Sequence, residues 1–536
     1  HSPTSEQPGR PVSLDDLRAT NTLQRTGWRI NRGVLETAQR ALSAGHPVLE
    51  VDPRWPPPRP VRIRSDEWAS LPSDARLRHI EAARAARTER TAWASTVSAL
   101  TSLLRAADAD RDHPSLWIPY GHDARLRRYP LVSSGPSPQG SGLSRSILMF
   151  DQGVPLGSRG LYWLAVRAAT CAGLDKLDHD ARAEWASQHT EEIRATARDP
   201  FATSWWWEGR DDPWGLLATA FELHEALAEP SPGDFHSHLP VQVDGTCNGL
   251  QHLSAMGLDP RGAYATNLTD SRERQDIYEL VARRVRSRVA DDVERGLEVS
   301  LVWGGEAVTR DTVKRGVMTT PYGVTARGLR DQLLDDDLVP ETDDAGAAAD
   351  YLRDVMWESI GHVVVAARNL MDWLQTTAAT LATHNVPFRW TTPTGSILQQ
   401  SYRPVVVIRP LTKFGRVYLG SSVDRSSLKV RKQALGASPN YVHSFDAAHM
   451  AMTINAGADR GITHWSTIHD SYGTHAARMD TLNRTLREEF VRIYETDWLR
   501  HTWEMTREYA PRVEIAPPPV RGDFDVSQVL KSPWFF

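Results

Sequence analysis

Two short stretches decide the fold: VQVDGTCNGLQH at residues 241–252 and WSTIHDSYGT at residues 465–474. In the first, a short apolar run leads into Asp244, and glycines then permit a turn into a helical pattern. In the second, alternating residues on both sides of Asp470 predict a hairpin with this carboxylate at its bend. Each stretch alone is more often an ordinary turn. Together they predict that two distant segments build one site.

A third stretch, TRDTVKRGVMTTPYG at residues 309–323, places Arg310, Lys314 and Tyr322 at multiples of four residues. In a helix these side chains share one face. An ordinary solvated face explains the segment equally well. The functional interpretation is that the two cations bind a triphosphate while Tyr322 meets the sugar and base. Because proline lacks a backbone donor, Pro321 predicts that the helix kinks or ends just before Tyr322.

A fourth stretch, SPNYVHSFDAAH at residues 438–449, predicts a helix that begins near Ser444 and carries His449 one turn in. A lone helical histidine is more often structural than functional. The evidence for a catalytic role of His449 is that the other three stretches occur in the same chain.

The two Asp residues suit phosphoryl transfer, which needs charge neutralisation more than covalent help from the protein. Two Mg²⁺ ions roughly 4 Å apart supply it by clamping the attacking and leaving oxygens. Because Mg²⁺ keeps waters and substrate phosphate oxygens as ligands, two carboxylates on adjacent strands are enough protein ligands. The sequence therefore predicts a magnesium site at Asp244 and Asp470.

The composition sets broad limits on the class of protein. The chain has 536 residues, is 40% apolar and carries a formal net charge of -5. This length predicts several domains with sizeable cores, and a nucleic-acid channel needs only local positive charge. Cys171 and Cys247 lie far apart, which argues against a disulfide framework or a zinc cluster. No apolar run is long enough to cross a membrane, so we expect a protein of the cytoplasm.

The chain divides into regions of different character. Residues up to about 120 are mostly helical in pattern, with a proline-rich break at 53–60 and one long helix expected over 82–107. Short apolar runs among Gly and Pro turns then predict mixed strands and helices. A second helical block at about 270–385 precedes expected strands at 405–408 and 417–419.

The four stretches, in this order, resemble the signature segments of single-subunit RNA polymerases of bacteriophages and mitochondria. The resemblance extends from about Thr22 to the end of the chain. It implies an α+β, multi-domain and predominantly helical right-hand fold of thumb, palm and fingers with an antiparallel palm sheet. The implied regions are a helical, thumb-like part at 1–120, a palm at 121–260 and 449–536, and fingers at 261–448 with a specificity loop at about 396–437.

The resemblance also implies roles for individual residues. Asp244, Asp470 and the Gly245 carbonyl would hold two Mg²⁺ ions, for which Mn²⁺ can substitute. The other implied roles are triphosphate binding by Arg310 and Lys314, ribose selection by Tyr322, nucleotide contact by Tyr278, contact with the sugar 2′-hydroxyl or primer end by His449, support of the metal carboxylate by His469, and nucleic-acid contact by Arg125, Arg127 and Arg315.

Two departures from the family pattern affect these expectations. Relatives often carry Asp-x-x-Gly-Arg where this chain has Asp123 to Arg127 with Leu126 in place of the glycine, so the contact made there should shift. Relatives also have a large region ahead of the Trp28 segment that reads and melts promoter DNA. Its absence here predicts weak use of closed duplex promoters and a preference for single-stranded, premelted or hairpin templates.

The resemblance implies DNA-directed synthesis of RNA, with a DNA template, an RNA product and ribonucleoside triphosphates as partners. DNA polymerases of the same superfamily carry a Glu after the first catalytic Asp and His-Asp-Glu at the second, and this chain has neither. A primase-like or RNA-templated enzyme remains open, because templates are gripped through backbone and shape. A non-catalytic nucleic-acid-binding protein is the third interpretation. We expect a monomer in the cytoplasm of a bacterial host, encoded by a phage or prophage.

Overall fold

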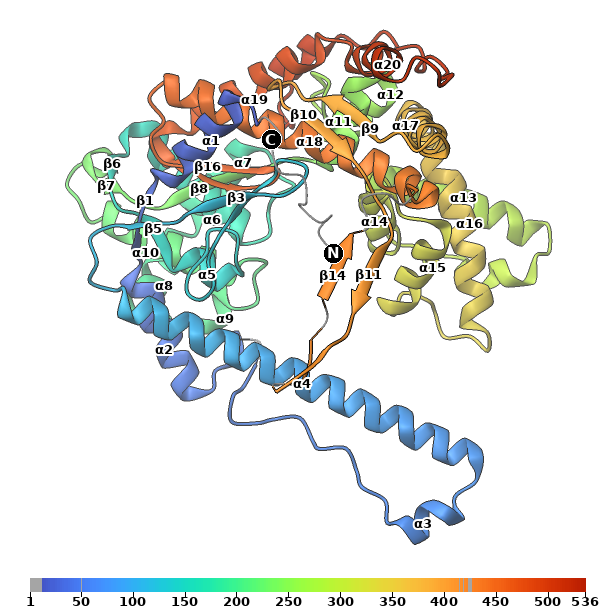
Figure 1. Ribbon diagram of the computed structural model, residues 1–536. Helices are drawn as coiled ribbons and strands as arrows, with labels where there is room; N and C mark the ends of the chain where they lie inside the picture. Colours follow the sequence, from blue (N-terminus) through green and yellow to red (C-terminus); the bar gives the residue numbers. More distant parts are fainter. Residues whose placement is uncertain (1–11, 50, 414, 418, 423–426) are drawn as a thin grey trace.

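The computed structural model describes residues 12–49, 51–413, 415–417, 419–422 and 427–536. Its N-terminal part contains one long helix that, with a short helix at its far end, extends away from the body (Figure 1). This helix confirms the one expected over 82–107. The elements are α1 (Leu14–Gln24), β1 (Gly27–Ile30), α2 (Arg32–Ala44), α3 (Ser65–Ser70), α4 (Ser73–Ala109), β2 (Leu116–Trp117), β3 (Tyr120–His122) and β4 (Arg128–Pro130).

The second part alternates short strands with helices, as the Gly and Pro turns predict. Its strand β5 pairs with β1, so the N-terminal segment joins this part through the sheet β2-β1-β5. The elements are α5 (Gly142–Ser146), β5 (Leu148–Phe150), β6 (Val154–Pro155), α6 (Gly157–Cys171), α7 (His179–Gln188), α8 (Thr190–Arg198), α9 (Ser204–Trp207), α10 (Pro213–Ala226), β7 (His236–Ser237), β8 (Pro240–Asp244) and α11 (Asn248–Met256).

The third part is a helical block followed by short hairpins. The helices α13, α14, α15 and α16 gather on the side of the molecule opposite α6 and α10 (Figure 1). The elements are α12 (Pro260–Ala265), α13 (Ile277–Glu294), α14 (Arg310–Thr319), α15 (Ala326–Asp335), α16 (Ala345–Val363), α17 (Val365–Thr383), β9 (Phe388–Thr391), β10 (Ile397–Gln400), β11 (Val405–Ile408), β12 (Leu411–Thr412), β13 (Gly415–Arg416) and β14 (Leu419–Ser422).

The strand expected over 405–408 is confirmed as β11, which pairs with β14. The strand expected over 417–419 starts only at Leu419, and residue 418 lies outside the described residues. The chain then continues through α18 (Val430–Asp459), β15 (Ser466–Ile468), β16 (Ser471–His475), α19 (Met479–Tyr494) and α20 (Trp498–Tyr509).

The helix expected to begin near Ser444 begins much earlier, and that prediction was wrong. α18 starts at Val430 and passes through Pro439. A proline inside a helix removes one backbone donor and leaves the carbonyl of Leu435 without its helical partner, a cost that tertiary packing must offset. α18 packs against α17, α1 and α19, and most of its residues from Ala437 onward are buried.

The site is positioned by the antiparallel sheet β15-β16-β8, on which α6 and α19 pack. Its middle strand carries Gly473. A Cβ atom there would lie 2.8 Å from the carbonyl oxygen of Ser466 and 2.9 Å from that of Val241, so only glycine fits. Antiparallel strands, small sheets and a majority of helix confirm the predicted α+β class.

A buried ion pair joins α1 to the sheet region. Arg128 donates to Asp16 Oδ1 at 2.9 Å and to the carbonyl oxygen of Ala447 in α18 at 3.0 Å, and both charged side chains are fully buried. Thr394 and Ser396 each donate to Asp16 Oδ2 at 2.7 Å. Every polar atom of this carboxylate therefore has a protein partner. No helix among the described residues is long and apolar enough to cross a membrane.

Candidate active site

The two Asp residues meet at one edge of the sheet β15-β16-β8. Asp244 ends β8, and Asp470 lies in the two-residue turn between β15 and β16. Because the register places Ser471 opposite Asp244, the turn that carries Asp470 stands directly beside the end of β8. Both residues and Gly245 line a cavity of about 610 Å³. The two segments, which are distant in the sequence, therefore line one cavity.

Both carboxylates have pKa values above the ordinary value for aspartate. Loss of hydration within the cavity walls and the nearby charge of Asp470 raise the pKa of Asp244. Burial likewise raises the pKa of Asp470, against an opposing effect of Arg127. Among the described residues neither carboxylate forms an ion pair within 4.0 Å. Two close carboxylates without a protein cation suit a divalent metal ion.

The described residues contain no group of three or more His, Cys, Asp or Glu side chains arranged to hold a metal ion. Two carboxylates can still bind Mg²⁺, because this ion takes water and substrate phosphate oxygens as its remaining ligands. The side chain of Asp244 is open to the cavity and that of Asp470 is half-buried. The donor set present fits Mg²⁺ or Mn²⁺ that binds together with a polyphosphate substrate.

The face of α14 lines the same cavity. Arg310 and Lys314 reach it from the helix, and Tyr322 reaches it from the turn that follows. α14 ends at Thr319, as the proline before Tyr322 predicts. Arg310 donates to Asp276 Oδ2 at 2.6 Å, and its guanidinium lies 4.9 Å from the ring centre of Tyr278. Lys314 is exposed and has no ion pair among the described residues.

His443 lies against Tyr322, with 4.3 Å between the ring centres. Its Nδ1 accepts a hydrogen bond of 2.7 Å from Arg125, which Asp123 holds at 2.6 Å. Burial and two nearby arginines lower the pKa of His443 to about 2, so this ring is neutral at physiological pH. Sequence reasoning missed this residue, although it lies in the quoted stretch 438–449.

Gly249 in α11 allows Tyr322 to approach closely. A Cβ atom at Gly249 would lie 3.0 Å from the Tyr322 hydroxyl and 3.0 Å from the side chain of Pro321. A larger residue would have to push the phenol away. Gly249 therefore fixes how closely Tyr322 can approach the start of α11.

The structure does not bring His449 to the cavity. Its Nε2 lies 2.9 Å from the carbonyl oxygen of Leu486 and its Nδ1 lies 3.0 Å from the hydroxyl of Tyr472, and the side chain is fully buried. His443 and His449 are six residues apart, which is about 240° around a helix. The expectation of a sugar contact at His449 is therefore corrected: the histidine that lies beside Tyr322 is His443.

His469 precedes Asp470 in the turn and adopts a left-handed φ of 47°. Its ring meets the edge of the Tyr129 ring at 4.9 Å, and burial together with Arg127 lowers its pKa to about 4. The backbone turn thus places a neutral imidazole next to Asp470 in sequence.

Three arginines were expected to contact nucleic acid. Arg125 is bound to Asp123 and His443 behind Tyr322. Arg127 forms an ion pair with the buried Asp446 of α18. Arg315 is exposed on α14, pairs with Asp336 and does not line the cavity.

Leu126 keeps the backbone conformation that a glycine would favour. Its φ is 68°, in the left-handed region, and its side chain is buried with 6% exposed. Burial of the apolar side chain offsets the strain of about 1 kcal/mol that a non-glycine residue meets there. Because Leu126 adopts this conformation, the replacement of the family's glycine by leucine does not force the backbone there to change.

Four more arginines line the cavity and were not singled out in the sequence. They come from α5, α6, α7 and the segment before α13, so no local pattern connects them. Together with Arg310 and Lys314 they give the walls around the two carboxylates a positive charge. They are Arg145, Arg167, Arg182 and Arg274.

Comparison with known proteins defines the class. A model of the family described as DNA-dependent RNA polymerase matches residues 154–512, which include both cavity carboxylates and α14. The chain belongs to this family.

Among curated relatives, the mitochondrial DNA-directed RNA polymerase 1 of Nicotiana sylvestris is 34% identical over 541 residues, 97% of this chain and 52% of that protein. The chloroplastic/mitochondrial DNA-directed RNA polymerase 2 of Arabidopsis thaliana is 34% identical over 542 residues, with the same shares. The chain thus spans about half the length of the curated relatives it matches. A solved structure, the POL domain of Pol1 from M. smegmatis in complex with DNA primer-template and dNTP, aligns over 90% of this chain and 67% of that chain with 14% identity and a TM-score of 0.39.

Proposed function

We propose that this chain catalyses template-directed RNA synthesis, in which a ribonucleoside triphosphate is joined to an RNA 3′-hydroxyl on a DNA template. One observation carries the proposal: the unpaired carboxylates of Asp244 and Asp470 share a cavity with the cations Arg310 and Lys314. Carboxylates for metal ions and cations for phosphates are the two requirements of phosphoryl transfer. Family membership supports the same reaction.

In this proposal Asp244, Asp470 and the Gly245 carbonyl hold two Mg²⁺ ions, for which Mn²⁺ can substitute. When bound, the ions neutralise charge on the attacking and leaving oxygens. Lys314, which has no ion pair within the described part of the chain, is available for the triphosphate. Arg310 would exchange part of its contact with Asp276 for phosphate oxygens, and its stacking on Tyr278 fixes the direction of the guanidinium.

Selection of ribose is assigned to Tyr322 and His443. The neutral ring of His443 accepts from Arg125 through Nδ1, so its Nε2 carries the proton and can donate to a hydroxyl. Because Asp123 and Arg125 orient this ring, a sugar 2′-hydroxyl beside Tyr322 would meet fixed donors. A Cβ atom at Gly245, directly after Asp244, would lie 3.1 Å from Gln251 Oε1 and 3.2 Å from the ring of Phe536, so a larger residue there would disturb the packing beside the carboxylate.

The proposal assigns α4 and its neighbours to a thumb, the sheet β15-β16-β8 with its helices to a palm, and α13 to α16 to fingers. We further propose that the enzyme acts as a monomer in the cytoplasm of a bacterial host. Primase-like synthesis and copying of RNA are alternatives that use the same residues, and the choice of template separates them.

The test is incorporation of labelled ribonucleotides with Mg²⁺ on matched single-stranded, hairpin and closed-duplex DNA and on single-stranded RNA. The wild type is compared with Asp470→Asn and with Asp459→Asn, a surface carboxylate paired with Arg18. We expect DNA-dependent product from the wild type and from Asp459→Asn, and none from Asp470→Asn. Product made on RNA alone would favour the RNA-templated alternative, and product that persists in Asp470→Asn would contradict the proposed centre.

A further inference from the structure

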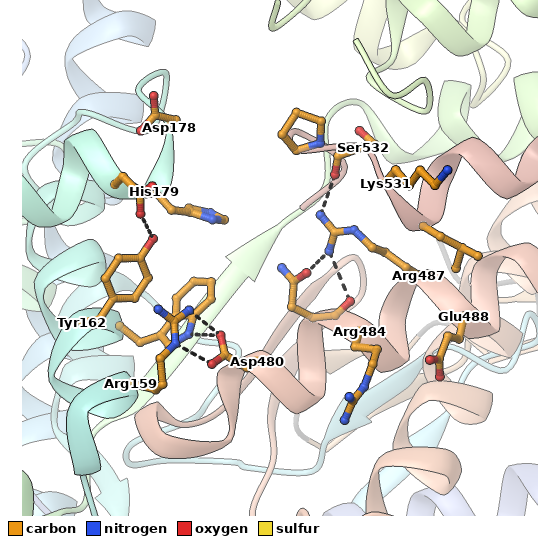
Figure 2. A pocket seen from close by; sticks show the side chains of 15 residues that line it. Arg159, Tyr162, Asp178, His179, Asp480, Arg484, Arg487, Glu488, Lys531 and Ser532 are labelled. Carbon is orange, nitrogen blue, oxygen red and sulfur yellow. Dashed lines mark hydrogen bonds and ion pairs between the residues drawn. The ribbon is translucent and has the colours of Figure 1, made fainter. Parts of the chain in front are cut away.

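A second cavity of about 640 Å³ lies next to the first one. One wall comes from α6 and the start of α7, and the other from α19 and the C-terminal segment at residues 530–533 (Figure 2). His179 and Pro533 line both cavities, so the two are neighbours. Its volume falls within the usual range of sites for drug-sized ligands.

Two of the four acidic residues that line this cavity, Asp480 and Glu488, form ion pairs with arginines. Asp480 forms an ion pair with Arg159 at 2.6 Å and accepts from Trp163 Nε1 at 2.8 Å. Glu488 is paired with Arg460. The cations on the α19 wall are different: among the described residues, the exposed Arg484 and Lys531 have no carboxylate oxygen within 4.0 Å.

Arg487 adds a third positive charge to this wall. It is 8% exposed, and its hydrogen bonds go to neutral acceptors, the carbonyl oxygen of Ser532 at 2.8 Å and Asn483. Burial without a carboxylate partner lowers the pKa of Arg487 to about 10. A buried guanidinium that lacks a counter-ion favours an anionic ligand.

The opposite wall offers different chemistry. The rings of Tyr162 and His179 are partly buried there, and Arg159 lies over one face of the Tyr162 ring, 4.3 Å from its centre. Burial and nearby arginines lower the pKa of His179 to about 4, which leaves a flat, neutral ring. Asp180 accepts from the Tyr162 hydroxyl at 2.8 Å, and Asp178 caps α7, so one oxygen of each carboxylate remains open to accept from hydroxyl groups.

We propose that this cavity is a second nucleotide site, which binds the phosphates of a ribonucleoside triphosphate on Arg484, Arg487 and Lys531 and its nucleoside against Tyr162 and His179. The ribose hydroxyls then face Asp178 and Asp180. The site is separate from the triphosphate cations of α14. Because Arg487 also holds Ser532, a bound nucleotide fixes the segment that leads to Phe536 in the catalytic cavity.

The experiment is equilibrium dialysis of the full chain with labelled ATP, without template and with EDTA, in an Arg310→Ala/Lys314→Ala background that weakens the catalytic cavity. We expect about one ATP bound per chain. Adding Arg484→Gln and Lys531→Gln should weaken this binding by about tenfold or more, because two charged contacts are lost. The matched control Arg500→Gln, which breaks an exposed ion pair on α20, should leave it unchanged.

Competition identifies the ligand class. ATP should displace labelled ATP at lower concentration than inorganic tripolyphosphate does, because the nucleoside adds contacts. No ATP bound in the background variant, or binding that Arg484→Gln/Lys531→Gln leaves intact, would overturn the site. Equal competition by tripolyphosphate would overturn the nucleoside contacts. Thermal unfolding of each variant checks the fold, and since no incorporation is measured, the outcome is independent of the proposed polymerase activity.

Discussion

Two regions of the molecule treat carboxylates in opposite ways. Asp16 in α1 is fully buried, and Arg128, Thr394 and Ser396 satisfy it. Although burial raises its pKa, the charge of Arg128 and these hydrogen bonds hold the pKa of Asp16 below its ordinary value. Asp244 and its neighbour Asp470 line a cavity, have no ion-pair partner among the described residues, and have raised pKa values.

The comparison distinguishes a carboxylate that stabilises the fold, Asp16, from two carboxylates that remain available for a ligand, Asp244 and Asp470. At Asp16 the protein supplies every partner, so the group contributes to stability and offers nothing to solvent. At Asp244 and Asp470 the repulsion between like charges is left in place, which costs stability unless a cation binds. The pattern of partners, and not burial alone, therefore marks the functional site.

The largest expected effect is on activity. Asp244→Asn removes one metal-binding charge, and we expect ribonucleotide incorporation to fall by about a thousandfold or more. The free energy of unfolding without metal should stay the same or rise, because repulsion with Asp470 is relieved. Incorporation rates and urea unfolding of the same preparation measure both. If Asp244→Asn lost activity only because the protein was less stable, Asp244 would be a structural carboxylate like Asp16, and the contrast between the two regions would fail.

At Asp16, which is paired with Arg128, we expect substitution to lower stability. Asp16→Ala leaves Arg128 buried without its counter-ion, and we expect the free energy of unfolding to fall by about 3–5 kcal/mol. Replacing both partners, as Asp16→Leu with Arg128→Met, should recover part of this loss. Urea denaturation measures it. An Asp16→Ala protein as stable as the wild type would show that the pair is not structural.

The pH dependence should also have opposite signs in the two regions. A folded-state pKa raised above the ordinary value of 3.8 at Asp244 means that the native state binds more protons than the unfolded state, so stability falls as the pH rises above 3.8 towards neutral. The lowered pKa of Asp16 gives stability that is lost as the pH falls below 3.8. Because Mg²⁺ binds the deprotonated carboxylates, its stabilisation should grow with pH.

Thermal unfolding with and without Mg²⁺ between about pH 5 and about pH 8 tests this sign. We expect Mg²⁺ to raise the unfolding temperature by about 2 °C or more at the higher pH and by less at the lower pH. In Asp244→Asn the pH trend of the Mg²⁺ effect should vanish. An equal gain at both pH values would mean that the ion binds elsewhere.

The smallest expected effect concerns the two histidines of α18. His443→Asn should lower the preference for ribonucleotides over deoxyribonucleotides by about tenfold, because one hydrogen bond beside Tyr322 is lost. His449→Asn should leave that preference unchanged but lower stability, since both of its ring nitrogens are bound within the protein. Incorporation with paired nucleotides measures the ratio. A larger effect at His449 would reverse the assignment.

The sequence predicted the parts of the site that depend on local rules. A short strand that ends in a carboxylate and a turn with glycine locate Asp244 and Asp470, and the proline before Tyr322 marks the end of α14. These features depend on strand alternation and on backbone chemistry, which can be read within about ten residues.

The residues that were missed depend on tertiary packing. A role for His449 was expected from the family resemblance, and no role was assigned to His443. The helix was expected to begin near Ser444, whereas α18 begins at Val430, passes through Pro439 and packs against α17 and α19. Arg145 and Arg182 come from separate helices and meet only in the cavity. Spacing within one segment cannot predict which side of a buried helix faces the site.

The most direct measurement is binding of Mn²⁺, followed by electron paramagnetic resonance with and without a ribonucleoside triphosphate. It is made on the wild type, on Asp244→Asn and on Asp459→Asn. We expect bound Mn²⁺ in the wild type and in Asp459→Asn, increased by the triphosphate, and its loss in Asp244→Asn. Equal binding by all three proteins would contradict the claim that this carboxylate pair is kept for a divalent cation.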